Sequence, residues 1–244
     1  MKQGMFQITK NQPLTGSMFR MDLTGDVSAF TRPGQFLNIR LAGRFLRRPI
    51  SVCDLRKDEV TILYKVVGGG TEQMSHMQPG ERLDILTGLG NGYDLAPAGE
   101  NPLLMGGGAG VPPLYLLAKE LRGQGKRVQV VLGFNTAGEV FWEEEFRKTG
   151  AEVKVTTADG SYGIRGFVTD AIPETYSYVY TCGPEPMLKA VYRAASTDGQ
   201  FSFEERMGCG FGACMGCSCK TITGYKRICK DGPVLRKEEI LWEN

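Results

Sequence analysis

The sequence lacks several features that would assign a function directly. Its 244 residues include one histidine, and His76 falls in a short predicted helix, where we interpret it as structural. No run of about 18 apolar residues is present, so we predict no membrane span. The N-terminus has no apolar stretch typical of a signal peptide, and a net charge of +2 provides no global field for binding nucleic acid.

Cysteine and glycine, in contrast, are abundant. Seven cysteines without an export signal indicate a reducing compartment, so we expect a cytoplasmic protein whose cysteines bind metal rather than form disulfides. Thirty-three glycines indicate many turns and close approaches of the backbone to ligands.

Four cysteines near the C-terminus form the most informative motif. Cys209, Cys214 and Cys217 follow a C-x4-C-x2-C spacing, and Cys229 lies twelve positions later. This is the opening spacing of plant-type [2Fe–2S] ligation by four thiolates. Cys219 competes for the fourth position, but a ligand from a separate strand closes the cluster more easily, so we prefer Cys229. A zinc-stapled, non-enzymatic binding module is an alternative of another class.

The first hundred residues predict a small antiparallel β-barrel, because short apolar or alternating runs are separated by turn residues. After residue 102 strands alternate with helices, which predicts βαβ units and a parallel sheet. The expected barrel strands are Met5–Thr9, Met18–Leu23, Gln35–Leu41, Ile50–Leu55, Val60–Val67 and Arg82–Leu86. The expected helices of the second part are Pro112–Leu121, Val140–Lys148, Phe167–Ile172 and Pro186–Ala195.

We therefore expect a multi-domain protein of the β plus α/β class. Residues 1–98 would form the barrel, residues 99–198 the α/β domain, and residues 199–244 a small C-terminal cluster segment. That last segment is too short for much of a core, so its metal would act as a staple.

Two motifs in the predicted barrel suit a flavin dinucleotide. In Arg48-Pro49-Ile50-Ser51 the arginine can pair with a pyrophosphate, and the serine can bond a flavin ring atom. Leu63-Tyr64-Lys65 precedes Gly68-Gly69-Gly70-Thr71 and an expected helix at Glu72–Met77, which Thr71 would cap while its first N–H groups face an anion. Each motif alone also suits a structural turn or a surface arginine, but the two together indicate FAD.

Two further motifs suit a nicotinamide dinucleotide. Gly106-Gly107-Gly108-Ala109-Gly110 follows an apolar strand and precedes a helix opened by two prolines, which favours a bound phosphate. Thr181-Cys182-Gly183-Pro184 ends a strand, where ligands of open α/β sheets collect. The second strand ends in Gly133-Phe134-Asn135-Thr136 without an arginine for a 2′-phosphate, which favours NAD over NADP.

In this order the motifs resemble the ferredoxin-NADP⁺ reductase superfamily over almost the whole chain. The segments Glu205–Cys219 and Tyr225–Val234 narrow the resemblance to the electron-transfer subunits of class 1B dihydroorotate dehydrogenase. The resemblance implies FAD contacts at Arg48, Pro49, Ile50, Ser51, Leu63, Tyr64, Lys65, Gly70 and Thr71. It implies nicotinamide contacts at Gly107, Gly108, Gly110, Cys182 and Gly183, and cluster ligation by Cys209, Cys214, Cys217 and Cys229. In one departure, Ile50 stands where many members have an aromatic residue.

The resemblance implies an oxidoreductase component that conducts electrons and has no catalytic acid or base of its own. A partner subunit with FMN would oxidise dihydroorotate in pyrimidine biosynthesis, and electrons would pass through [2Fe–2S] and FAD to NAD⁺ in a heterotetramer of two plus two. An alternative is the flavin and iron–sulfur subunit of another NAD(P)H-linked complex, such as a ferredoxin or sulfur-compound reductase. Five basic residues near the last ligand form either a docking surface or a solvated face: Lys226, Arg227, Lys230, Arg236 and Lys237.

Overall fold

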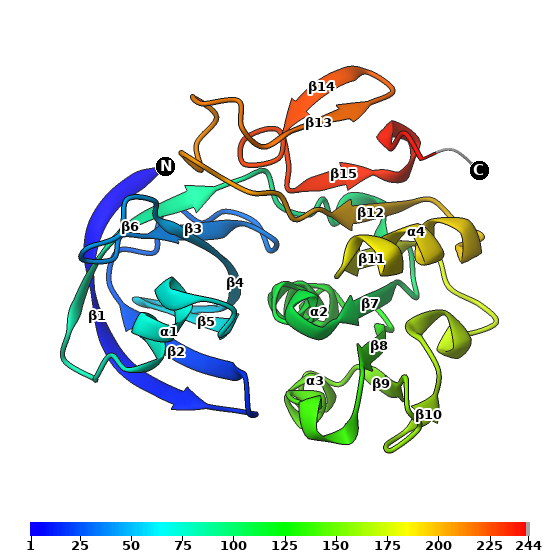
Figure 1. Cartoon of the computed structure of the whole chain (residues 1–244). Coiled ribbons are helices and arrows are strands. Elements are labelled where there is room, and N and C mark those ends of the chain that lie inside the picture. Colours follow the sequence, from blue (N-terminus) through cyan, green and yellow to red (C-terminus); the bar gives the residue numbers. More distant parts are fainter. Residues whose placement is uncertain (243–244) are drawn as a thin grey trace.

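Six antiparallel strands close into a barrel at the N-terminal end of the chain (Figure 1). In the computed structural model, which describes residues 1–242, the strand order of the barrel is β1-β2-β5-β4-β3-β6. The predicted antiparallel barrel is therefore confirmed. Its elements are β1 Lys2–Pro13, β2 Met18–Thr24, β3 Phe36–Ile39, β4 Arg48–Arg56, β5 Glu59–Lys65, α1 Gly69–Ser75 and β6 Arg82–Leu89.

The second part is a seven-stranded sheet in the order β10-β9-β8-β7-β11-β12-β15. Neighbouring strands run parallel except for β15, which is antiparallel to β12, so the predicted α/β fold is confirmed. The strands are β7 Leu103–Gly107, β8 Gln129–Phe134, β9 Glu152–Thr157, β10 Ile164–Arg165, β11 Val179–Cys182, β12 Gly199–Ser202 and β15 Val234–Arg236. Helices α2 Pro113–Gly123 and α3 Glu143–Lys148 cover one face, and α4 Glu185–Ala194 covers the other.

The C-terminal segment forms a hairpin and then returns to this sheet. Strands β13 Ser218–Thr221 and β14 Gly224–Arg227, orange in Figure 1, pair only with each other in the sheet order, whereas β15 adds to the edge of the large sheet. The large sheet therefore includes strands from beyond residue 198. The division of the chain into domains 1–98, 99–198 and 199–244 stays a prediction. No helix among residues 1–242 is long and apolar enough to cross a membrane.

Two of the helices expected after residue 102 differ from the observed ones. The expected helix at 140–148 begins at Glu143, after a 3₁₀ turn at Ala137–Glu139. The expected helix at 167–172 is a 3₁₀ turn at Val168–Ala171. Both are short segments, in which a single turn and an α-helix have nearly the same apolar pattern.

Helix α2 packs against the sheet and the barrel at once, and in Figure 1 it lies between them. Leu114 and Leu117 of α2 share one buried cluster with Cys53 and Leu63 of the barrel. Leu116 packs instead with the barrel core. Since apolar burial is the main stabilising term in such contacts, this helix fixes how the two parts sit on each other.

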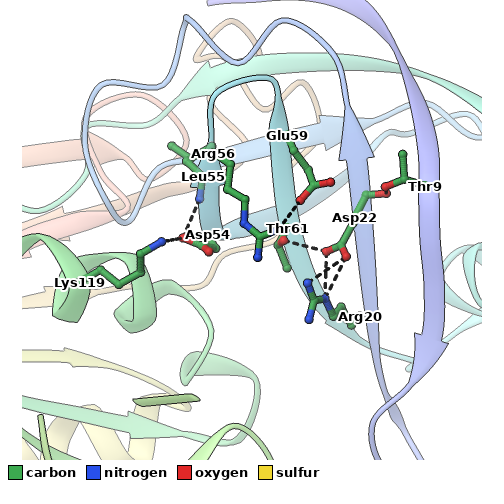
Figure 2. A network of polar contacts seen from close by, with 9 residues as sticks. All are labelled: Thr9, Arg20, Asp22, Asp54, Leu55, Arg56, Glu59, Thr61 and Lys119. Carbon is green, nitrogen blue, oxygen red and sulfur yellow. Dashed lines mark hydrogen bonds and ion pairs between the residues drawn. The ribbon is translucent and has the colours of Figure 1, made fainter. Parts of the chain in front are cut away.

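A bulge on β4 adds a polar contact to this interface (Figure 2). The register between β4 and β5 shifts between Val52 and Asp54. A bulge re-aims side chains, and here Cys53 and Asp54 both face away from the barrel core toward α2. The Asp54 carboxylate, 7% exposed, lies 2.5 Å from the ammonium of Lys119 and also accepts the N–H of Leu55 at 3.0 Å.

We expect Lys119→Met to destabilise the chain by about 1–3 kcal/mol, because it leaves the buried Asp54 carboxylate without its cation. Asp54→Asn combined with Lys119→Met should cost less than the sum of the single changes, with a coupling of at least about 1 kcal/mol. Urea unfolding followed by the fluorescence of Trp142, which lies at this interface with Arg20 5.9 Å from its ring, measures these values.

The exposed pair Arg56–Glu59, also drawn in Figure 2, is the matched control. Its atoms are 3.2 Å apart, but the Arg56 side chain is 62% exposed. Arg56→Ala should therefore change stability by less than about 0.5 kcal/mol. If the losses in unfolding free energy from the Asp54 and Lys119 changes were strictly additive, the Asp54–Lys119 ion pair would not be what holds the interface.

Candidate redox-cofactor site

Strands β4 and β5 separate at the end of the barrel that carries the flavin motifs. They pair only from Val52 opposite Ile62 to Arg56 opposite Glu59. Residues 48–51 of β4 therefore pair with β3 alone, and residues 63–65 of β5 pair with β2 alone. The two facing backbone edges have unpaired polar groups, which need partners from a ligand or from water. The two predicted flavin segments thus flank one opening.

Arg48 lies against the start of α1. A Cβ atom built on Gly70 would lie 2.1 Å from its Nε, so the guanidinium rests directly on the backbone of this glycine. The Arg48 Nη1 donates to the Leu46 carbonyl at 2.6 Å, and Arg44 donates to the Gly69 carbonyl at 2.8 Å. Two guanidinium groups thus gather at one helix start, which suits a phosphate. The sequence analysis missed Arg44; its place in a run of basic residues, Arg44-Phe45-Leu46-Arg47-Arg48, is the signal that could have identified it.

Thr71 shapes the loop before α1 rather than capping the helix from outside. Its hydroxyl accepts the N–H of Val67 at 3.0 Å and donates to the Gly68 carbonyl at 3.0 Å. Gly68 occupies the N-cap position. Thr71 therefore closes the loop, and the helix begins three residues earlier than the sequence indicated.

The second flavin segment buries two of its three side chains, on opposite faces of β5: Leu63 packs in the cluster with α2 and Tyr64 in the barrel core. Leu63 and Tyr64 are buried, and the Tyr64 hydroxyl donates to Asn11 at 2.9 Å. Ile50 packs half-buried against the barrel core, while Lys65 is exposed. For Leu63 and Tyr64 it is the backbone edge that faces the opening.

A cleft of about 500 Å³ lies where the barrel, the sheet and the C-terminal segment meet. It brings together predicted residues from two distant parts of the sequence: Pro49 and Ser51 of β4, and Cys182 of β11. Burial, with Glu204 nearby, raises the pKa of the Cys182 thiol to about 12, although a hydrogen bond with Ser202 opposes this. Cys182 therefore stays a neutral thiol at the base of the cleft.

The two nicotinamide motifs touch each other at the end of the sheet. A Cβ atom on Gly110 would lie 2.3 Å from the carbonyl oxygen of Cys182, and one on Gly107 would lie 2.4 Å from Sδ of Met187. Gly108 has φ +50° and no atom within 4 Å of its Cβ position, so its backbone is open to a ligand. Gly183, next to Cys182, packs on Met187 and Gly107.

The cluster cysteines form two pairs. In the first pair, the backbone N–H groups of Ala213 and Cys214 donate to Cys209 Sγ at 3.2 and 3.4 Å, and the Cys209 N–H donates to Cys214 Sγ at 3.4 Å. In the second pair, the Cys229 N–H donates to Cys217 Sγ at 3.4 Å. The first pair reaches solvent, whereas both cysteines of the second pair are 1% exposed.

The electrostatics of the two pairs differ. Burial opposes ionisation of Cys209, but the N–H groups of Cys214 and Phe211 outweigh it and lower the Cys209 pKa to about 6. Burial and the neighbouring thiols Cys217 and Cys209 raise the pKa of Cys229 to about 12. Bound iron would relieve that repulsion, because a metal ion favours the thiolate form.

The four cysteines fall into two pairs. Within residues 1–242, no three His, Cys, Asp or Glu side chains are placed around a single metal position. A [2Fe–2S] cluster divides its four cysteines between two irons, and the two pairs fit that division.

Cys219 takes no part in these sulfur hydrogen bonds. It lies on β13 and lines a separate cavity of about 150 Å³ with Leu188 and Trp242. The choice of Cys229 as the fourth ligand stays a prediction, and the sulfur contacts of the four cysteines favour it.

Asn38 is a second residue that the sequence analysis missed. It is 1% exposed on β3, and its side-chain NH₂ donates to the carbonyl of Cys209 at 3.2 Å. The signal in the sequence is a polar residue within the apolar run Phe36-Leu37-Asn38-Ile39.

Comparisons with known proteins agree with this arrangement. A family model described as the iron-sulfur cluster binding domain of dihydroorotate dehydrogenase B matches residues 204–241. A solved structure titled as the NADH-dependent reduced ferredoxin-NADP oxidoreductase is similar with a TM-score of 0.89 and 31% identity, over 98% of this chain and 90% of that chain.

Two curated relatives are similar over nearly their full length. The dihydroorotate dehydrogenase B (NAD(+)) electron transfer subunit of Geobacillus sp. (strain WCH70) is 43% identical over 99% of this chain and 99% of its own. The subunit of the same name from Fusobacterium nucleatum subsp. nucleatum is 43% identical over 96% of both chains. By this similarity the chain belongs to the family of dihydroorotate dehydrogenase B electron transfer subunits.

Proposed function

We propose that this chain is the electron-transfer subunit of an NAD-dependent dihydroorotate dehydrogenase. It would pass electrons from the FMN of a catalytic subunit through [2Fe–2S] and FAD to NAD⁺. The observation that carries the proposal is that parts of the predicted sites meet at one cleft. Its lining includes Pro49 and Ser51 of β4, Cys182, against which the glycine turn packs, and residues 204–207, which lead to the cysteine pairs.

The residues of the chain then have distinct tasks. Arg48, with the start of α1 at Gly70 and Thr71, would hold the FAD pyrophosphate, and the open edges of residues 48–51 and 63–65 would hold the rest of the flavin. Gly107, Gly108, Gly110, Cys182 and Gly183 would form the nicotinamide nucleotide site. Cys209, Cys214, Cys217 and Cys229 would hold the cluster. When bound, a flavin exchanges two electrons with a nicotinamide and single electrons with an iron–sulfur centre.

The partner subunit would dock over the exposed cysteine pair. Cys214 is exposed, and Phe211 and Met215 beside it are 43% and 52% exposed, an apolar surface that suits a protein contact. Four of the five basic residues considered for docking have internal partners: Lys226 with Glu239, Arg227 with Asp231, Arg236 with Asp94, and Lys237 with the Ala195 carbonyl. Docking would thus rely on Phe211 and Met215 more than on charge.

Three further parts of the proposal concern organisation. The domains would comprise residues 1–98 for FAD, 99–198 for NAD and 199–244 for the cluster. The complex would be a cytoplasmic heterotetramer of two plus two subunits. The reducing cytoplasm would keep the cluster cysteines available for iron.

The NADH-dependent ferredoxin-NADP oxidoreductase structure supports a second candidate function. Its identity of 31% over 98% of this chain favours a flavin and iron–sulfur subunit of another NAD(P)H-linked complex. The curated relatives, at 43%, favour the dihydroorotate reading.

Co-expression with an FMN-containing dihydroorotate dehydrogenase catalytic subunit tests the proposal. The anaerobically purified complex should contain FMN, FAD, iron and sulfide, and should oxidise NADH only when orotate is present. Oxidation of NADH with a ferredoxin but not with orotate would favour the second candidate. A colourless protein containing zinc would overturn both.

Cys214→Ser should lose most of its iron and sulfide while the FAD remains reducible by NADH, because the flavin opening lies on the barrel and not in the cysteine loop. Cys219→Ser, the matched control, should keep a full cluster. Iron and sulfide analysis with the absorption spectrum measures both. Equal iron loss in the two variants would contradict the proposed ligand set.

Gly110→Ala should raise the KM for NADH roughly tenfold, because its Cβ would collide with the Cys182 carbonyl and overpacking costs about 1–3 kcal/mol. The FAD content should not change. Gly123→Ala, at the far end of α2 with no atom within 4 Å of its Cβ position, is the control. Steady-state NADH oxidation measures the effect, and an unchanged KM would argue against a nicotinamide site at this turn.

A further inference from the structure

Asn38 connects the flavin side of the barrel to the cysteine loop. Its NH₂ donates to the Cys209 carbonyl at 3.2 Å, and in the β3–β4 ladder it stands opposite Pro49 of the flavin motif. The backbone carbonyl of Asn38 accepts a hydrogen bond from Arg47 Nη1 at 3.3 Å. One buried residue therefore touches the strand assigned to FAD and the loop assigned to the cluster.

The loop is shaped to receive this side chain. Gly210 has φ +78°, and a Cβ atom there would lie 2.3 Å from Nδ2 of Asn38. Only glycine combines that backbone conformation with so close an approach. The loop consequently rests directly on the amide.

Packing alone does not explain an amide at this position. The side chain is 1% exposed, and its Oδ1 is buried without a hydrogen-bond partner among the described residues. An unpaired buried acceptor is destabilising, and leucine would fill a similar space without that cost. The polar contact that the structure shows for this side chain is the hydrogen bond from its NH₂ to the Cys209 carbonyl.

We propose that Asn38 is a positioning residue that holds the Cys209 loop on the barrel and so fixes the separation between flavin and cluster. Asn38 lies on the same face of β3 as Phe36, and Phe36 lines the cleft. The inference rests on the proposed function, because it presumes that both cofactors bind. Arg227 of β14 holds the same loop from the other side, where its Nη1 donates to the Gly212 carbonyl at 3.0 Å, and Asn38 is the contact that ties the loop to the barrel.

The test compares the anaerobically purified full-length wild type with Asn38→Leu, Asn38→Ser and Asn101→Leu. Leucine keeps the volume but cannot donate, and serine is too short to reach Cys209. Asn101 is the matched control, because its NH₂ also donates to a backbone carbonyl at 3.2 Å, that of Thr175. Two readouts are measured: the rate of iron release to a chelator, and the magnetic coupling between the singly reduced flavin and the reduced cluster.

Both Asn38 variants should release iron roughly tenfold faster than wild type, the effect of losing one hydrogen bond. The magnetic couplings between flavin and cluster should be spread over a wider range of values than in the wild type. FAD content and flavin reduction by NADH should stay unchanged. Asn101→Leu should match the wild type in every measurement. If Asn38→Leu does not fold, Asn38→Ser decides.

Wild-type iron release and coupling in the Asn38 variants would overturn the proposal, and so would equal changes in Asn101→Leu. Neither readout requires dihydroorotate, orotate or the partner subunit. A wild-type complex that fails to couple orotate to NADH would therefore refute the proposed function without affecting the result for Asn38.

Discussion

The packing of α2 between two cores is the constraint on which the proposed sites depend. The glycine turn that precedes this helix would form the nicotinamide side, and the barrel strands that the helix packs on carry the predicted flavin motifs. Leu114 and Leu117 hold the helix in the cluster that it shares with the sheet, and Leu116 inserts into the barrel core. Because interiors are close-packed and deform little, the two cofactor sites keep a fixed relation to each other.

The opening proposed for the flavin lies between backbone edges of β4 and β5 that do not pair with each other. It does not depend on particular side chains. Strands β4 and β5 pair for part of their length and then separate, so one end of the barrel keeps unpaired N–H and C=O groups. Tyr64 illustrates the consequence. Its ring is buried and its hydroxyl is bonded to Asn11, so its contribution to a ligand would come from its main chain, which a motif of residue types does not reveal.

The sequence predicted the barrel, the parallel sheet and the grouping of the glycine turn with Cys182, because these follow from local periodicity and from the rule that ligands gather at strand ends. It did not predict that β12 and β15 extend the sheet, since pairing between residues 200 and 236 is a long-range choice. Asn38 and Asp54 were missed for the same reason. Their roles depend on partners 171 and 65 positions away in the chain.

The cysteine motif identifies four thiols but not the contacts that hold each one in place. These contacts differ between the two pairs. Cys217 and Cys229 belong to a buried cluster with Ile228 and Leu235, so apolar packing holds them in place. Cys209 and Cys214 lie in a glycine-rich loop at the surface, where packing contributes little. In the proposed complex that loop would face the partner subunit and still stay close to the barrel. A polar contact from a buried strand satisfies both needs, because it anchors the loop from below and leaves the outer side of Cys214 free.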